Sequence, residues 1–223
     1  MTLKTDYPGH DRLYQQRKQQ GCPGWDDDEQ WQVWRAEIGR LIADALFPKS
    51  GAVLELGAGA GDVALLFAEK GYEAAGIEIS PTAVAWAREK AVQHGLAVEF
   101  VEGSVTDLSH WDEDSFDAVV DGHCLHCIIG DDRAKVFSET FRVLKPGGLL
   151  YVSTMCGEPK EPDVVKQYNP ASRCMVWNGI ARRYLGRPDD IIGEIGRAGF
   201  RIERHLVVTN EGTQDDLLVY AIK

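Results

Sequence analysis

The sequence predicts an α/β protein in which helices cover both faces of a mainly parallel sheet. Short apolar runs of strand length alternate with segments whose apolar residues recur every three or four positions, as in an amphipathic helix. A cluster of glycines ends the first apolar run, and two strand patterns with no helix between them close the chain. Alternating strands and helices are typical of parallel sheets, and the closing pair must include one antiparallel strand.

The expected elements follow one another in a regular order. Acidic residues at 26–29 suit the start of a helix that carries Trp31 and Trp34 and stops before Pro48. Ser80 and Pro81 begin a later helix as its cap and first residue. The patterns predict strands at 52–56, 73–79, 97–101, 117–120, 149–153, 200–208 and 217–222, and helices at 62–70, 81–94, 132–144 (capped by Asp131) and 188–198.

The size of the chain predicts a single domain of residues 1–223. Its 223 residues, 44% of them apolar, are enough for one substantial core. We expect an N-terminal helical cap at 1–49, in which one helical turn surrounds Tyr14, and a core at 50–153. An insertion at 154–187 precedes a helix and C-terminal hairpin at 188–223. Insertions of this length are usually functional or mobile.

The charge balance disfavours nucleic acid as a partner. The net charge is -11 and the pI is about 5.0, so the protein body repels phosphate backbones. Arg182, Arg183 and Arg187 form a local basic cluster, which suits either an anionic substrate or a solvated helix face. We expect a cytoplasmic protein without membrane contact, because residues 1–10 lack a signal-peptide core, no stretch is apolar enough to span a bilayer, and the five cysteines suit a reducing compartment.

A glycine-rich turn at 57–61 follows the first strand and opens the next helix. Glycines let a backbone approach a ligand closely, and open α/β sheets bind ligands beyond the carboxyl ends of their strands. Glu55 lies just before this turn, and Glu78 ends the second strand, where two carboxylate oxygens can accept both hydrogens of a ribose diol. Asp62 stands where the dinucleotide fingerprint needs its third glycine, so NAD or FAD is disfavoured.

Four segments resemble the class I S-adenosylmethionine-dependent methyltransferases, a superfamily with a Rossmann-like fold. They occur in the family's order, and the similarity covers about residues 50–153. The segments are Glu55-Leu56-Gly57-Ala58-Gly59-Ala60-Gly61, Gly76-Ile77-Glu78-Ile79-Ser80, Phe116-Asp117-Ala118-Val119-Val120-Asp121 and Arg142-Val143-Leu144-Lys145-Pro146-Gly147-Gly148.

The resemblance implies a doubly wound sheet of seven strands in the order 3-2-1-4-5-7-6, with strand seven antiparallel and helices on both faces. It implies S-adenosyl-L-methionine as the cofactor, with the methionine part at the glycine turn and the ribose on Glu78. The end of the fourth strand would line the sulfonium and the acceptor. The implied cofactor-binding residues are Glu55, Gly57, Ala58, Gly59, Gly61, Glu78, Ile79, Ser104, Val105, Asp121 and Gly122.

One position departs from the family's pattern. Members often carry an aspartate toward the adenine amine in the loop after the third strand, and here Ser104 stands at that place. The Ser104 hydroxyl and the Val105 amide are expected to share the contact, ahead of the nearby Asp107. Ile79 would touch the adenine ring.

Residues 121–127 combine two histidines with a Cys-x-x-Cys pair. Three interpretations stay open: buried structural residues, acceptor chemistry with His123 or His126 as the catalytic base or orienting group, and a thiolate–imidazole metal site. The spacing to Cys156 and Cys174 fits no compact zinc pattern, so we expect no metal.

Aromatic residues cluster in the two segments where the family places acceptor-specific walls. We expect Tyr14 and Trp25 from the N-terminal region, and Tyr168 and Trp177 from the insertion, to form an acceptor lid. Aromatic rings can hold a sulfonium by cation–π attraction and shield the transfer from water. Trp31 and Trp34 could equally anchor the first helix on the sheet.

The sequence therefore predicts a methyltransferase that acts on a small-molecule acceptor by in-line displacement. Segment 76–80 is similar to that of thiol and chalcogen methyltransferases, so a thiol acceptor is a sub-hypothesis beside amines, hydroxyls and carboxylates. A protein methyltransferase and a non-catalytic cofactor-binding module are the alternatives. We expect a monomer or homodimer.

Overall fold

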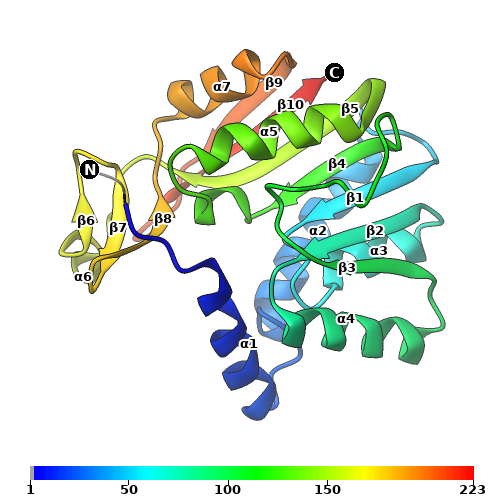
Figure 1. Cartoon of the computed structure of the whole chain (residues 1–223), viewed down its shortest axis with the longest axis horizontal. Helices are drawn as coiled ribbons and strands as arrows, with labels where there is room; N and C mark the ends of the chain where they lie inside the picture. Colours follow the sequence, from blue (N-terminus) through cyan, green and yellow to red (C-terminus); the bar gives the residue numbers. More distant parts are fainter. Residues whose placement is uncertain (1–2) are drawn as a thin grey trace.

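The computed structural model of the chain describes residues 3–223, so the first two residues of the predicted cap lie outside the described range. Strands and helices alternate along the chain (Figure 1). The elements are η1 (Tyr7–Gly9), α1 (His10–Gln19), α2 (Asp28–Ala43), β1 (Ala52–Leu56), α3 (Asp62–Glu69), β2 (Glu73–Glu78), α4 (Pro81–His94), β3 (Val98–Glu102), β4 (Phe116–Gly122), η2 (Leu125–Cys127), α5 (Asp132–Val143), β5 (Leu144–Cys156), α6 (Pro162–Val165), β6 (Tyr168–Asn169), β7 (Cys174–Trp177), β8 (Ile180–Tyr184), α7 (Pro188–Arg197), β9 (Arg201–Val208) and β10 (Asp215–Ile222).

The main sheet has seven strands in the order β3-β2-β1-β4-β5-β10-β9. This is the expected order 3-2-1-4-5-7-6, with β9 as the sixth strand and β10 as the seventh. β10 runs antiparallel to both β5 and β9, whereas β1 pairs in parallel with β2 and β4. The predicted fold class is confirmed.

The register brings three strand ends together at one edge of the sheet. Leu56 of β1 lies opposite Ile77 of β2 and Asp121 of β4. Because these strands are parallel, the segments after Leu56, Glu78 and Gly122 leave the sheet on the same side. The predicted ligand-binding residues are therefore brought together in the turns that follow β1, β2 and β4, at one edge of the sheet.

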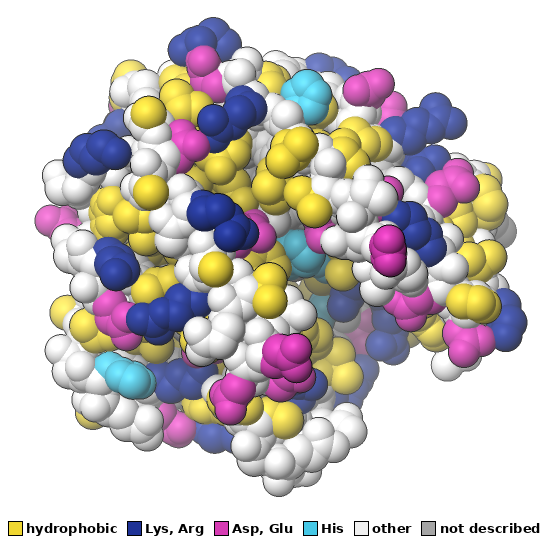
Figure 2. All heavy atoms as spheres, turned by 180° about the vertical axis from the view of Figure 1, so that it is seen from behind, with side chains coloured by type: hydrophobic (Ala, Val, Ile, Leu, Met, Phe, Trp, Pro, Cys, Tyr) yellow, Lys and Arg dark blue, Asp and Glu magenta, His cyan; other side chains and the backbone are white. Residues whose placement is uncertain are grey.

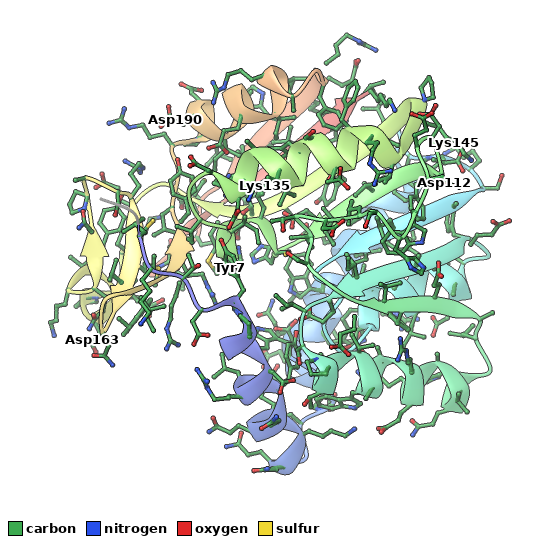
Figure 3. All side chains as sticks on the ribbon, in the orientation of Figure 1. Tyr7, Asp112, Lys135, Lys145, Asp163 and Asp190 are labelled. Atoms are coloured by element: carbon green, nitrogen blue, oxygen red, sulfur yellow. The ribbon has the colours of Figure 1, made fainter. Side chains whose placement is uncertain are left out.

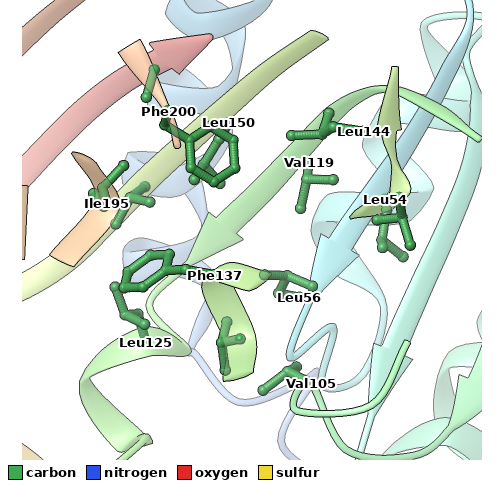
Figure 4. Close-up of a cluster of buried hydrophobic side chains, with 14 of the residues drawn as sticks. Leu54, Leu56, Val105, Val119, Leu125, Phe137, Leu144, Leu150, Ile195 and Phe200 are labelled. Atoms are coloured by element: carbon green, nitrogen blue, oxygen red, sulfur yellow. The ribbon is translucent and has the colours of Figure 1, made fainter. Parts of the chain in front are cut away.

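Side chains alternate between two buried layers, one on each face of the sheet. Leu54 and Leu56 of β1 belong to the cluster packed under α5 and α7, with Phe137 and Ile195 (Figure 4). Val53, which precedes Leu54, faces the opposite cluster, which α2 and α3 complete. Each fully buried side chain of this size contributes about 1.5–3 kcal/mol, so the two layers hold the strand ends rigidly.

The N-terminal region is more ordered than predicted. α1 is a helix of several turns where the sequence predicted one turn around Tyr14. The Asp11 carboxylate fixes α1 on the start of α4, because it accepts hydrogen bonds from the Ser80 hydroxyl at 2.7 Å and the Thr82 amide at 3.0 Å. Ahead of α1, Lys4 pairs in parallel with Ile180 of β8.

The insertion at 154–187 folds into a second, antiparallel sheet of β6, β7 and β8, which the sequence did not predict. It lies at the side of the main sheet, next to the N-terminal segment (Figure 1). β5 is also longer than expected and begins at Leu144, which pairs with Phe116 before the ladder shifts register. No helix within residues 3–223 has the length and apolarity to cross a membrane.

The expected cap at Asp131 is wrong. Asp131 has helical backbone angles (φ -65, ψ -19) and its side chain makes no capping hydrogen bond. The helix α5 is positioned instead by its own packing and by Arg133, whose guanidinium donates to the carbonyl of Leu125 at 2.8 Å.

Gly61 and Gly71 have nearly equal backbone angles but different surroundings, so comparing substitutions at the two positions separates the cost of close packing from the cost of backbone strain. Gly61 has φ +86, and a Cβ there would stand 2.7 Å from Phe100 and 2.8 Å from Ala87, whereas Gly71 has φ +87 and open space. We expect Gly71→Ala to cost about 1–2 kcal/mol from left-handed strain, and Gly61→Ala to cost about 1–3 kcal/mol more from overpacking. Urea unfolding of both variants measures the difference, and equal losses would contradict this role for Gly61.

Candidate active site

A cleft of about 1310 Å³ opens at the edge of the sheet where β1, β2 and β4 end. Typical ligand pockets measure roughly 300–1,000 Å³, so this one has room for two ligands side by side. Viewed from behind, the molecule is hollowed, with histidine side chains at the wall of the hollow (Figure 2). Its walls come from α1, α2, the turns after β1, β2, β3 and β4, and residues of β5, β8, β9 and β10.

The glycine turn forms one wall of the cleft. Gly57 and Gly59 have φ +66 and +52, which a residue with a Cβ adopts only with strain. The space beside Gly57 is filled by Cys124, and the space beside Gly59 by the hydroxyl of Tyr14. These glycines therefore bring two protein side chains against the backbone at the cleft. Burial raises the pKa of Tyr14 well above its usual range, so its phenol stays neutral.

Two buried carboxyl groups lie beside this turn. Glu55 is 4% exposed and accepts a hydrogen bond from the Ala64 amide at 2.8 Å, which ties β1 to the first turn of α3. Glu78 is 7% exposed and accepts from the Gly59 amide at 3.1 Å and the Ser80 amide at 2.9 Å. Burial raises the pKa of both groups. Each Glu78 oxygen keeps a second lone pair, and Glu78 lines the cleft.

Most of the other residues expected at the cofactor also reach the cleft. These residues are Ala58, Ile79, Ser104, Val105 and Gly122. The hydroxyl of Ser104 shares a hydrogen bond of 2.8 Å with that of Thr106. Asp107 lies outside the cleft and accepts a hydrogen bond from the Ser109 amide at 3.0 Å.

Gly61 and Asp121 do not line the cleft, contrary to expectation. Gly61 lies behind the turn against Phe100. The Asp121 side chain turns into the interior because its Oδ1 accepts from the amides of Cys124 at 2.9 Å and Leu125 at 2.8 Å. Asp121 therefore shapes the loop after β4 and does not face the cleft.

The buried carboxyl of Asp121 makes stability depend on pH. Desolvation raises its pKa to about 7, although the hydrogen bonds from the Leu125 and Cys124 amides lower the pKa. The folded state thus holds this proton more tightly than the unfolded state. The contribution of Asp121 to the free energy of unfolding is therefore fully present below pH ~4 and is lost as pH rises through about 7. Its Oδ2 has no hydrogen-bond partner among residues 3–223.

Asp121→Asn should therefore stabilise the protein at pH 8 by a few kcal/mol and change little at pH 4.5. The amide oxygen keeps the two backbone contacts, and its NH₂ can donate to Thr140, whose buried Oγ1 lines the same small internal void. Thermal unfolding of both proteins from pH 4.5 to 8 measures the effect. Parallel curves across this range would contradict it.

Two histidines stand next to each other on the cleft wall after β4. The His123 ring packs edge-on against Trp34 at 4.7 Å and His126 at 5.3 Å between ring centres. Its Nε2 lies 3.3 Å from Oδ1 of Asp216 on β10, without the alignment of a hydrogen bond. His126 is 4% exposed, and burial lowers its pKa well below the usual range, so the ring is neutral.

The N-terminal segment passes over the other end of the cleft. The Tyr7 hydroxyl donates to Asp132 at 3.1 Å and accepts from the Ile129 amide at 3.1 Å, which ties the segment to the start of α5 (Figure 3). His10 Nδ1 donates to the Tyr7 carbonyl at 3.0 Å. Arg183 reaches the same region from β8 and donates to Cys127 Sγ at 3.2 Å.

Comparison with known proteins agrees with this geometry. Residues 54–152 match the family described as "Methyltransferase domain". This segment, which runs from β1 to β5, is therefore similar to methyltransferase domains.

Relatives of this domain are similar over part of their length. The demethylmenaquinone methyltransferase of Thermus thermophilus is 35% identical over 129 residues, 57% of this chain and 56% of the relative. The chain matches only about half the length of the first curated relatives it resembles.

Solved structures share the whole fold at low identity. The 1,6-didemethyltoxoflavin-N1-methyltransferase of Burkholderia thailandensis, with S-adenosylhomocysteine bound, has a TM-score of 0.70 at 18% identity and covers 100% of this chain and 93% of its own. The [4+2]-cyclase SpnF has a TM-score of 0.76 at 17% identity and covers 100% and 98%.

The structure places the expected aromatic lid differently. Tyr14 and Trp25 line the cleft and pack against each other at 5.2 Å between ring centres. Tyr168 and Trp177 lie outside it, contrary to expectation, because they belong to β6 and β7, and only β8 of that sheet lines the cleft.

Several cleft residues were not predicted as site residues. Trp34 faces the cleft and contacts His123, so it does more than anchor α2. Tyr7, His10 and Asp216 carried no motif that could have marked them, whereas Arg183 belonged to the basic cluster already noted. Within residues 3–223, no group of three or more His, Cys, Asp or Glu side chains is arranged to hold a metal ion.

Proposed function

We propose that this chain transfers the methyl group of S-adenosyl-L-methionine to a small-molecule acceptor. The observation that carries the proposal is the Glu78 carboxylate. It is held by the amides of Gly59 and Ser80, faces the cleft beside the glycine turn, and keeps free lone pairs. A fixed diol acceptor at this point suits the ribose of an adenosyl group.

The residues present fit the rest of the cofactor. The backbone at 57–59 would hold the methionine part, and Ile79, Ser104 and Val105 would contact the adenine. The neutral Tyr14 ring beside Gly59 would cover the sulfonium and exclude water. When bound, S-adenosyl-L-methionine supplies a methyl group that is already activated by its positive sulfur, so the protein mainly aligns the acceptor.

His123 is the residue best placed to take a proton from an acceptor. Its Nε2 faces Asp216, which leaves Nδ1 as the basic nitrogen. A carboxylate beside the ring can hold the ring in one orientation, as in other histidine bases. A separation of 3.3 Å can shorten when the acceptor binds.

The part of the cleft where the acceptor would bind is covered by the N-terminal segment, and this favours a small molecule over a protein side chain as the acceptor. The N-terminal segment and α1 close one side of the cleft, so a partner chain would have to displace them. Similar proteins are named for small molecules, such as the demethylmenaquinone methyltransferase and the didemethyltoxoflavin methyltransferase. A thiol acceptor stays one of the classes to test.

Transfer of radiolabelled methyl from S-adenosyl-L-methionine to thiol, amine, phenol and carboxylate acceptors tests the proposal. We expect turnover with at least one class and binding of S-adenosylhomocysteine by calorimetry. Cofactor binding without methyl loss to any acceptor, free or in a protein, would identify a binding module instead. Methylation of protein substrates alone would identify a protein methyltransferase.

A further inference from the structure

Arg183 is a cation in the cleft that forms no ion pair with an acidic side chain in the described part of the chain. It projects from β8 and lines the cleft, and its guanidinium donates to Cys127 Sγ at 3.2 Å and to the Arg182 carbonyl at 3.1 Å. Within residues 3–223, no carboxylate lies within 4.0 Å of it; Glu161 lines the same cleft but makes no such contact. Neither of its two contacts neutralises its charge.

Several arginines elsewhere in the chain pair with carboxylates, whereas the partly buried Arg17 donates to the Gly24 carbonyl. Arg133 lies 2.7 Å from Glu194, and Arg204, another arginine of the cleft wall, pairs with Asp44. The net charge is -11, so acidic side chains outnumber the basic ones available to pair with them. Withdrawing a guanidinium from water without a counter-charge costs free energy, so an unpaired Arg183 indicates a place where an anion binds.

His126 marks the same wall by an independent observation. Its side chain is 4% exposed and lines the cleft, and its buried Nδ1 has no hydrogen-bond partner among residues 3–223. A neutral imidazole has one donor and one acceptor nitrogen. Leaving such a group unsatisfied in the interior costs about as much as a lost hydrogen bond. The adjacent residue, Cys127, is the one that Arg183 contacts.

We infer that Arg183 and His126 form a subsite for a carboxylate group of the methyl acceptor. This inference rests on the proposed function, which it narrows to anionic acceptors. The planar guanidinium fork binds both carboxylate oxygens, and neutral His126 donates one more hydrogen bond. Cys124 packs on Gly57, and Cys127, which Arg183 contacts, follows it in the same cleft-lining segment, so a bound acceptor would extend from Arg183 toward the methyl donor.

The inference is tested first by binding, without any turnover. Benzoate and benzamide have nearly the same shape and differ in charge, and cleft tryptophans such as Trp34 report their binding by fluorescence. We expect the wild type to bind benzoate roughly tenfold more tightly than benzamide. Arg183→Met should lose this preference, and Arg183→Lys should retain part of it.

Arg182→Met is the matched control, because Arg182 is the exposed neighbour on β8 and does not line the cleft. It should keep the full preference for benzoate. No preference in the wild type, no detectable binding of either probe, or a preference that survives in Arg183→Met would overturn the inference. Circular dichroism of each variant confirms that it is folded.

Turnover separates this inference from the proposed function. With 3-mercaptobenzoate and 3-mercaptobenzamide as acceptors, we expect Arg183→Met to raise KM for the acid about tenfold while kcat and cofactor affinity stay unchanged. If neither compound nor any other acceptor is methylated, the proposed function fails, and the benzoate comparison still decides the subsite. Equal KM values for the acid in wild type and Arg183→Met would overturn the subsite while leaving the methyltransferase intact.

Discussion

Replacing Glu78 with alanine should weaken the binding of S-adenosyl-L-methionine by about 100-fold or more. Hydrogen bonds to a charged group contribute about 1.5–3 kcal/mol each, and this carboxylate is expected to make two with the ribose. The substitution also releases the amides of Gly59 and Ser80, so the turn beside the cofactor loses its brace. Calorimetric titration with S-adenosylhomocysteine measures the loss without any acceptor.

Glu73 provides the matched control for this prediction. It is an exposed glutamate at the opposite end of the same strand, β2. Glu73→Ala removes the same charge and should leave the affinity unchanged, and Glu78→Gln should give an intermediate loss because the amide retains one acceptor oxygen. If folded Glu78→Ala binds the cofactor like wild type, the ribose position is wrong, and with it the observation on which the proposed function depends.

The parts of the site that could be predicted from sequence are those formed by local structure. A glycine turn between a buried strand and a helix places residues 57–59 and Glu78 by backbone geometry alone, and the structure has both at the cleft. The α/β class follows from the alternation of strand and helix periodicities, whereas the strand order came from the family resemblance. Asp121 shows the limit: its position on β4 was predictable, but its side-chain direction depends on which amides the next turn presents.

The acceptor end could not be predicted because it is assembled from distant segments. Asp216 reaches His123 only because β10 inserts between β5 and β9. Tyr168 and Trp177 looked suitable as aromatic residues of an insertion, yet the pairing of β6 with β7 and β8 decides which side chains reach the cleft, and Arg183 does so instead. Strands as short as β6 and β7 have no clear hydrophobic periodicity, so the sequence did not predict this sheet or which of its residues face the cleft.

His123→Ala should reduce methyl transfer to a phenol acceptor by about 100- to 10,000-fold, the usual contribution of a general base. The backbone of His123 is held with φ +70 by a hydrogen bond from its amide to the Ser153 carbonyl at 2.9 Å. A side-chain-bearing residue in this region is strained, and such strain persists where the surrounding structure imposes it. Asp216→Asn should cause a smaller loss, because the ring remains but its orienting charge is gone.

The choice of acceptor distinguishes a base from a merely structural residue. A phenol, with a pKa of about 10, must lose its proton during transfer, whereas an aromatic thiol that is already ionised needs no base. A general base therefore predicts that His123→Ala and Asp216→Asn slow the phenol reaction and leave kcat for the ionised thiol and the cofactor Kd unchanged. His94→Ala, an exposed histidine at the end of α4, controls for the loss of an imidazole elsewhere. Equal losses with both acceptors would show that His123 only supports the cleft wall, because a packing defect does not depend on whether the nucleophile carries a proton.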